Sequence, residues 1–182
     1  MSGHSKWSKV KHQKATTDVV KGQAFTKASH AITIAVHEGA GVTNPDMNFR
    51  LRLAIEKARE VNMPKDTIER AIAKGKSEGG TGVETVLYEG YGPGGVGFLV
   101  EAATDNRQRT SSAIKNIFDQ YGGILAGSGA VSFLFDKQAS GEFMVRPHSA
   151  IILDETKRQE VAKLEEQLSQ LPDVQRVYTN VA

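Results

Sequence analysis

Residues 85–104, TVLYEGYGPGGVGFLVEAAT, carry the clearest structural signal of the chain. Two strand-like runs, Thr85 to Tyr91 and Val96 to Thr104, flank Gly92-Pro93-Gly94-Gly95. Runs rich in β-branched and aromatic residues that are separated by Gly and Pro are typical of a β-hairpin. A phosphate-binding loop would need Gly-Lys-Ser/Thr leading into a helix, whereas these glycines lead into a strand. The stretch predicts a tight hairpin; the alternative is a glycine loop that a nucleic-acid backbone or a partner approaches closely.

The chain after this hairpin alternates helical and strand-like patterns. Strands are expected over residues 131–135, 142–145, 150–153 and 174–179, and helices over residues 110–121 and from the cap Asp154 to Pro172. The order β-α-β, β-α-β is typical of the split βαβ, ferredoxin-like arrangement, in which two helices cover one face of an antiparallel sheet. The sequence therefore predicts an α+β lobe over residues 78–182, preceded by an extra hairpin strand.

Three helical patterns precede the hairpin. The first has alanines at positions 24, 28, 31 and 35 and stops at Gly39; the second opens at Asn44-Pro45; the third begins at Pro64 and ends at Gly75. Short connections favour a three-helix bundle over residues 17–77, followed by the glycine-rich linker 75–82. Residues 1–16 lack apolar periodicity, so we expect a basic arm that is ordered only when it docks.

Composition bounds the classes of protein. The chain has 182 residues, 39% of them hydrophobic, and no Cys. This apolar content excludes wholesale disorder, and the lack of Cys excludes disulfides, thiolate nucleophiles and Cys-ligated zinc or iron–sulfur sites. The longest uncharged apolar runs fall far short of the roughly 18 residues that a membrane span needs. The basic, polar start does not resemble a secretory signal, so we expect a cytoplasmic protein.

The net charge of +2 conceals an asymmetry along the chain. Residues 1–77 carry 14 Lys and Arg against 7 Asp and Glu, a net +7, whereas residues 78–182 carry 9 against 14, a net −5. Six lysines but one acid, Asp18, fall within the first 27 residues. Such asymmetry indicates an arm that faces a polyanion; the alternative is a merely solvated N-terminus.

Twelve residues are candidates for contact with nucleic acid: Lys6, Trp7, Lys9, Lys11, His12, Lys14, Lys21, Lys27, Arg50, Arg52, Arg107 and Arg109. Lysine neutralises phosphates, an indole stacks on bases, and a loop arginine suits bidentate phosphate contact. Trp7 could instead anchor the arm on the helices. Arg107 and Arg109 lie before a helix that Asn106 or Thr110 would cap, and they could instead bond nearby acids such as Glu101 or Asp105.

Catalysis and metal binding find no support in the sequence. Ser and His do not form a nucleophile elbow, and Glu165-Glu166 and Asp154-Glu155 fit a solvated helix face and a helix N-terminus. His30 and His37 are seven residues apart, where two ligands on one helix turn need a spacing of about four. We therefore expect neither an enzyme nor a metal, a cofactor or a small-molecule substrate.

Several longer motifs resemble one protein family. They are Gly3-His4-Ser5-Lys6-Trp7, Asn48 to Ile55 (NFRLRLAI), Asn62 to Ile72 (NMPKDTIERAI), Tyr88 to Gly95 (YEGYGPGG) and Thr104-Asp105-Asn106-Arg107. These residues resemble the YebC family, which includes the mitochondrial translational activator of cytochrome oxidase. The resemblance covers about residues 2–137, and Leu164 to Asn180 is similar to the family's C-terminus.

The resemblance implies a non-enzymatic, cytoplasmic regulator that binds nucleic acid. Bacterial members are usually described as probable transcriptional regulators that bind DNA. A second description makes them translation factors that act at the ribosome on difficult proline stretches, which would make ribosomal or messenger RNA the target. The family fold has an N-terminal helical domain and two α+β lobes, one inserted in the other.

The chain departs from the family pattern in two places. Only 18 residues lie between Phe135 and Asp154, where the family carries the inserted lobe, so this lobe is expected to be absent near residues 136–153. Gln23 and Ser29-His30-Ala31 replace charged residues that are common in the family. The sequence has no helix-turn-helix recognition pattern and no RNA-recognition aromatics, which favours shape and phosphate recognition. A protein–protein adaptor, whose sheet pairs with a partner, is the rival class.

Overall fold

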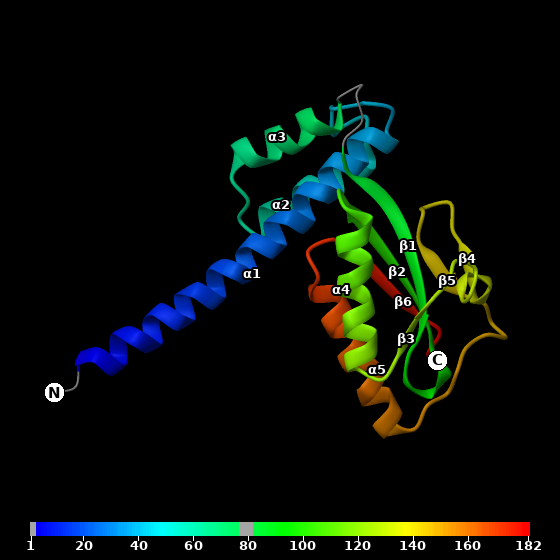
Figure 1. Ribbon diagram of the computed structural model, residues 1–182. Coiled ribbons are helices and arrows are strands. Elements are labelled where there is room, and N and C mark those ends of the chain that lie inside the picture. Colours follow the sequence, from blue (N-terminus) through cyan, green and yellow to red (C-terminus); the bar gives the residue numbers. More distant parts are fainter. Residues whose placement is uncertain (1–2, 77–81) are drawn as a thin grey trace. The chain divides into compact units, whose positions relative to one another are not determined.

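The computed structural model describes residues 3–76 and 82–182, with side chains from residue 20 onward, and its elements are drawn in Figure 1. The chain divides into two compact units, here called unit 1 (to Thr81) and unit 2 (from Gly82). Unit 1 holds α1 (Gly3–Glu38), α2 (Phe49–Glu60) and α3 (Lys65–Gly75). Unit 2 holds β1 (Glu84–Tyr91), η1 (Pro93–Gly95), β2 (Gly97–Thr104), α4 (Arg107–Gln120), β3 (Ile124–Ala126), η2 (Ser132–Leu134), β4 (Phe135–Lys137), β5 (Phe143–Val145), α5 (Glu155–Gln170) and β6 (Val174–Thr179). The fold class is α+β.

The first helix differs from the expectation. Residues 3–16, expected to lack regular structure, continue α1, which runs unbroken from Gly3 to Glu38. No Pro or Gly lies between Gly3 and Gly22, and Lys, Gln and Ala are good helix formers, so local propensity supports a helix that apolar periodicity did not reveal. The helix is about 54 Å long at 1.5 Å per residue.

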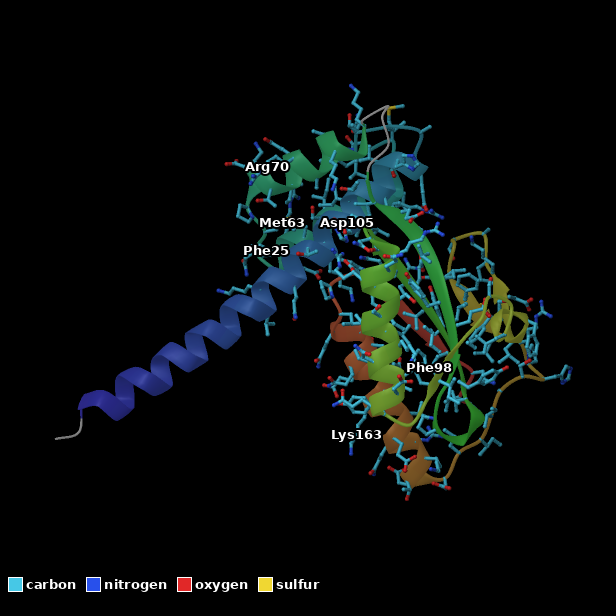
Figure 2. All side chains as sticks on the ribbon, in the orientation of Figure 1. Phe25, Met63, Arg70, Phe98, Asp105 and Lys163 are labelled. Atoms are coloured by element: carbon cyan, nitrogen blue, oxygen red, sulfur yellow. The ribbon has the colours of Figure 1, made fainter. Side chains whose placement is uncertain are left out.

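Unit 1 is built around the C-terminal half of α1, where α2 and α3 pack (Figure 1). The core combines small and medium side chains from all three helices: Ala28, Ile32, Ala35, Val36, Leu51, Ala54, Ile55, Ala58, Met63, Ile68 and Ala71. Phe25 and Met63, labelled in Figure 2, belong to this region. The alanines allow the helices to approach closely, but each buries little apolar area.

Asn48, not Asn44, caps α2. Its Oδ1 accepts from the backbone N–H of Leu51 at 3.0 Å, and its Nδ2 donates to the carbonyls of Ala35 (2.9 Å) and Val42 (3.1 Å). One buried amide therefore satisfies both the end of α1 and the start of α2. Asn44 instead closes a local turn, accepting from the N–H of Asp46 at 3.0 Å, so the expected start at Asn44-Pro45 is wrong.

The main sheet of unit 2 has the strand order β3-β1-β2-β6, and every neighbouring pair is antiparallel. β2, α4 and β3 form a split βαβ unit, because β1 lies between the two strands that α4 connects. The hairpin strand β1, expected as an extra, is thus central to the sheet. The hairpin itself is as expected, with Gly94 at φ 72° in the turn, a conformation that glycine adopts at little cost.

Two expected strands differ from the structure, and one observed strand was not expected. Residues 131–135 do not join the main sheet: Ser132–Leu134 form a 3-10 turn, and β4 pairs with β5 in a separate two-stranded ribbon. The stretch 150–153 contributes only an isolated bridge between Ile151 and Val181. β3 was not expected, since three residues are too few to show alternation. The family's inserted lobe was expected to be absent near residues 136–153. In the structure, these residues form most of the β4–β5 ribbon and the turns around it.

The sheet has a different cover on each face. Alternate residues of β2, Phe98 and Val100, pack against α4 and α5 with Ile114, Phe118 and Leu164. Phe98, labelled in Figure 2, meets Phe118 edge-on at a centroid distance of 5.7 Å. Leu99 points the other way and packs with Val131 and Phe135 beneath the β4–β5 ribbon. The two helices lie on one face of the sheet and the ribbon on the other (Figure 1).

A buried carboxylate holds the segment that leads into this ribbon. Glu89 on β1 is buried and accepts from three backbone N–H groups, those of Gly129 (2.8 Å), Val131 (2.7 Å) and Ser132 (2.8 Å). Burial alone would raise the pKa of Glu89, but the three donors outweigh it, and its pKa is lowered from the usual value. Glu89 therefore fixes residues 129–132 as a charged, hydrogen-bonded clamp.

Candidate nucleic-acid interface

The first six sequence candidates lie along the N-terminal part of α1. They are Lys6, Trp7, Lys9, Lys11, His12 and Lys14, and their side chains lie outside the described residues. Their helical backbone nevertheless sets their spacing. At 3.6 residues per turn, positions 6, 9, 14, 21 and 27 fall within less than half of the helix circumference. The sequence did not predict this continuous basic stripe, because it treated residues 1–16 as an arm separate from the helix.

Lys21 and Lys27 continue the stripe toward the core of unit 1. Lys21 is exposed, whereas Lys27 is half-buried. Burial, and then the charge of Lys57 on α2, lowers the pKa of Lys27 from its usual value. The ammonium of Lys27 is therefore partly desolvated and lies near the like charge of Lys57. Lys57 was not among the sequence candidates.

The two arginines of α2 have different partners. Arg50 pairs with Glu38 at 2.5 Å, and Arg52 lies over the ring of Phe49 with its Cζ 5.1 Å from the ring centroid. Both arginines are exposed, so neither is committed to the core. Phe49 is itself 61% exposed. The sequence analysis missed Phe49, although the buried stripe Leu51, Ala54, Ile55 and Ala58 leaves position 49 off the core face.

Arg107 and Arg109 belong to the first turn of α4, which Asn106 caps by accepting from the N–H of Arg109 at 3.0 Å. Arg107 makes a bidentate pair with the exposed Glu84, at 2.5 Å for each bond. This hydrogen bond, more than the charge of Arg107 itself, lowers the pKa of Glu84. The guanidinium of Arg107 is therefore paired within unit 2. The sequence left this alternative open, but with Glu101 or Asp105 as the acid and not Glu84.

Arg109 is tied more deeply than Arg107. It donates to Asp105 and to Asp173, each at 2.8 Å, and the side chain of Asp173 is only 7% exposed. The hydroxyl of Thr110 also reaches Asp173, at 2.7 Å. This arrangement joins the start of α4 to the loop before β6, so Arg109 has a structural role in unit 2. Sequence reasoning named Asp105 as an acid that these arginines could bond but missed Asp173, which is 64 residues away.

The surface of the described residues includes two open hollows. One, of about 550 Å³, lies between β1 and α4 and is lined by Val86, Tyr88, Arg107, Gln108, Ser111 and Ser112. The other, of about 330 Å³, lies between α2 and α3, where Ile55, Met63, Ile68 and Ile72 form the floor and Arg59, Lys65 and Glu69 the remaining lining. Neither brings together a nucleophile, a base and an oxyanion donor, so neither supports a catalytic site.

The described part of the chain bears on metal binding and membrane crossing as well. There, no three His, Asp or Glu side chains lie close enough together to hold a metal ion. No described helix is both long enough and apolar enough to cross a membrane.

Comparison with known proteins identifies relatives of both units. The family described as "TACO1/YebC protein N-terminal domain" matches residues 5–78, and "TACO1/YebC second and third domain" matches residues 83–143. A similar fold occurs in the crystal structure of a conserved hypothetical protein, Aq1575, from Aquifex aeolicus. That structure has a TM-score of 0.73 and 33% sequence identity, with 88% of this chain and 90% of that chain covered.

Curated relatives are similar over about three quarters of the chain. A protein of Sulfurihydrogenibium sp. (strain YO3AOP1), named a probable transcriptional regulatory protein, is 55% identical over 137 residues, which are 75% of this chain and 54% of that protein. A protein of the same name from Methylacidiphilum infernorum (isolate V4) is 53% identical over 139 residues, 76% of this chain and 55% of that protein. The chain spans about half the length of these curated relatives.

Proposed function

The chain belongs to the TACO1/YebC protein family, and on that premise we propose that it is a nucleic-acid-binding regulator of gene expression that performs no catalysis. The names of the relatives, probable transcriptional regulatory proteins, make transcription the process and DNA the first target to test. We propose the cytoplasm as its location. The observation that carries the proposal is the helix α1 with its lysines.

α1 presents a long, regular row of positive charge. Six lysines lie on one uninterrupted helix of 36 residues, and most of their positions share one side of it. Because each phosphate contact releases condensed counterions, such a row gives affinity for any nucleic acid without regard to sequence. The cations of unit 2 are less available, since Arg107 and Arg109 are already bonded to carboxylates.

The exposed face of α3 supports backbone contact over groove insertion. α2 and α3 are joined by only four residues, as in a helix-turn-helix, with Asn62 in the left-handed conformation (φ 59°). The solvent side of α3, however, mixes Lys65, Arg70 and Lys74 with Asp66 and Glu69. Acids in the first turn of a recognition helix would face the phosphates that flank the major groove. Recognition through phosphates and shape fits this surface better.

A salt titration tests the proposal. If about four phosphates are neutralised, log K should fall against log[salt] with a slope near −3.6 on duplex DNA, so affinity should drop on the order of 10² between 50 and 200 mM salt. Fluorescence anisotropy with a labelled duplex, and in competition with ribosomal RNA, gives both the slope and the preferred target. A folded protein that binds no nucleic acid at low salt would leave the adaptor as the better account.

A lysine triple variant locates the contact. Replacing Lys6, Lys9 and Lys11 with Ala should weaken binding to all sequences similarly and reduce the slope by roughly 3. The matched control replaces Lys137, Lys157 and Lys163 of unit 2, which removes the same charge from the acidic unit. Equal losses from the two triple variants would mean that net charge alone, and not α1, decides affinity.

A further inference from the structure

The N-terminal end of α2 carries an apolar surface that the fold does not use. Met47 is 78% exposed, Phe49 61% and Leu53 41%, although Leu51 between them is fully buried. Phe49 and Leu53 are four residues apart and so share one side of the helix. None of the three belongs to the buried core of unit 1. A single exposed apolar side chain is ordinary, but three between positions 47 and 53 indicate a contact surface.

Charge selects the kind of occupant. Arg52 lies over the Phe49 ring at 5.1 Å, and Arg50, next to it in sequence, is exposed and paired with Glu38 at 2.5 Å. Both side chains of that surface ion pair are partly exposed, at 51% and 39%, so it is worth little and can exchange for another anion. The acids Asp46 and Glu56, close in sequence, weaken the positive potential of this surface. A bound anion therefore has to lie close to the two guanidinium groups.

We propose that Phe49, with Arg52 stacked over it, is a stacking site for an unpaired nucleobase, and that Arg52 and Arg50 contact the phosphates of the same strand. An aromatic face beside cations is a combination that binds single-stranded nucleic acid. Every base has a π-face that can stack, and every phosphodiester link carries a negative charge. Bases within a duplex are already stacked on one another and cannot reach the ring. The site therefore predicts a preference for single-stranded over duplex segments. It rests on the proposed function and makes its target specific.

Binding of a labelled single-stranded 12-mer and of its duplex tests the site in the full chain. Phe49→Ala should weaken single-strand binding about 5- to 150-fold and leave duplex binding unchanged, since stacking is available only to unpaired bases. Phe49→Tyr should retain affinity. Phe49→Leu should lose it, because leucine keeps the apolar contact but has no π-face. Phe133→Ala is the matched control: this phenylalanine of unit 2 is 57% exposed.

A base analogue reports the stacking directly. 2-Aminopurine within the 12-mer should lose fluorescence on binding the native protein and keep it on binding Phe49→Ala. Arg52→Ala should lower the salt slope by about 0.7, the value of one single-strand phosphate contact, whereas Phe49→Ala should leave the slope unchanged. Circular dichroism checks that each variant is folded. We expect that it is, because the replaced side chains are exposed.

The outcomes separate this site from the proposed function. If the native chain binds single strands and Phe49→Ala binds them equally well, the stacking site is wrong while the regulator remains. The same conclusion follows if Phe49→Leu binds like the native protein, and the surface around Phe49 would then be a protein-contact surface. If the native chain binds no nucleic acid at low salt, the proposed function fails and this site fails with it.

Discussion

Units 1 and 2 use charge in opposite ways. In unit 2, six of the nine cations pair with carboxylates: Arg107, Arg109, Lys115, Arg146, Lys157 and Arg176. Among the side chains described in unit 1, Lys21, Lys57, Arg59 and Lys74 make no ion pair. Two cations of unit 1, Arg50 and Lys65, pair with Glu38 and Glu69 at the surface. Most cations of unit 2 are thus paired with its own carboxylates, whereas several described cations of unit 1 are not.

The hydrophobic cores of the two units differ in the size of their side chains. Five of the eleven buried residues in the core of unit 1 are alanines, and none is aromatic. The main core of unit 2 buries Phe98, Phe118, Ile114, Leu164 and Leu168 completely. Apolar area removed from water scales with side-chain size, so the core of unit 2 contributes more hydrophobic stabilisation per buried residue. We therefore expect unit 1 to unfold at lower denaturant concentration than unit 2.

Phe118→Ala should have the largest effect, lowering the free energy of unfolding of unit 2 by about 3–5 kcal/mol. Phe118 is fully buried and meets Phe98 edge-on, so truncation leaves a cavity where two strands and two helices converge. All four tyrosines lie in unit 2, so near-ultraviolet circular dichroism follows its unfolding. Protection of unit 1 amides from hydrogen exchange should not change; a parallel loss there would show that the units unfold as one.

Asn48→Ala should lower the free energy of unfolding of unit 1 by about 2–3 kcal/mol, because it removes a helix cap and the amide donor to the carbonyls of Ala35 and Val42. The Ala35 carbonyl keeps the N–H of Gly39 as a donor. Asn48→Asp keeps the cap acceptor but places an oxygen against those carbonyls. It should therefore be at least as destabilising, although aspartate is a good cap elsewhere. Hydrogen exchange of the α1 and α2 amides measures both variants. A stable Asn48→Asp protein would mean that capping alone accounts for the residue.

Glu89→Gln should cost unit 2 about 2 kcal/mol at pH 7, since an amide cannot accept from three backbone donors as a carboxylate does. The pKa of Glu89 is lowered in the folded state, so its contribution is complete above the unfolded pKa of about 4.3 and is lost as pH falls through the folded pKa. Urea unfolding of both proteins from pH 7 to pH 3 should show the difference shrinking only below about pH 4.3. A difference that stays constant down to pH 3 would contradict the charged clamp.

Arg109→Ala should destabilise unit 2 by about 1–2 kcal/mol, because Asp173 loses a charged donor where its carboxylate is buried. Arg107→Ala removes an exposed pair with Glu84 and should leave the unfolding midpoint unchanged within error. The two arginines are two residues apart, so each serves as the control for the other. Equal effects on the midpoint would show that burial of the partner does not decide the value of these pairs.

The hairpin and most helices could be predicted because their signals are local. Alternation, a glycine turn and helical spacing identified β1, β2, α4, α5 and β6 with only small shifts in their ends. The cap of α2 was misplaced because Asn44-Pro45 and Asn48 both have good local chemistry. The choice between them comes from the carbonyls of Ala35 and Val42, which only packing brings near Asn48.

The candidate interface was predictable in its charges but not in their availability. Counting residues was enough to separate a basic from an acidic half. The partners Glu84 and Asp173 are 23 and 64 residues away from the arginines that they neutralise, and no local pattern marks such pairs. The exposure of Phe49 follows from the buried stripe of α2. The position of the Arg52 guanidinium over its ring does not follow from any sequence pattern, because it depends on the side-chain conformations in the structure.

A basic helical half and an acidic α+β half follow from the order of residues alone, because charge, helix propensity and alternation are properties of neighbouring residues. Which strands share a sheet, how Glu89 holds residues 129–132 and which cations are paired depend on the folded arrangement. Those outcomes depend on contacts between residues far apart in the chain, whose free energies arise when packing removes them from water.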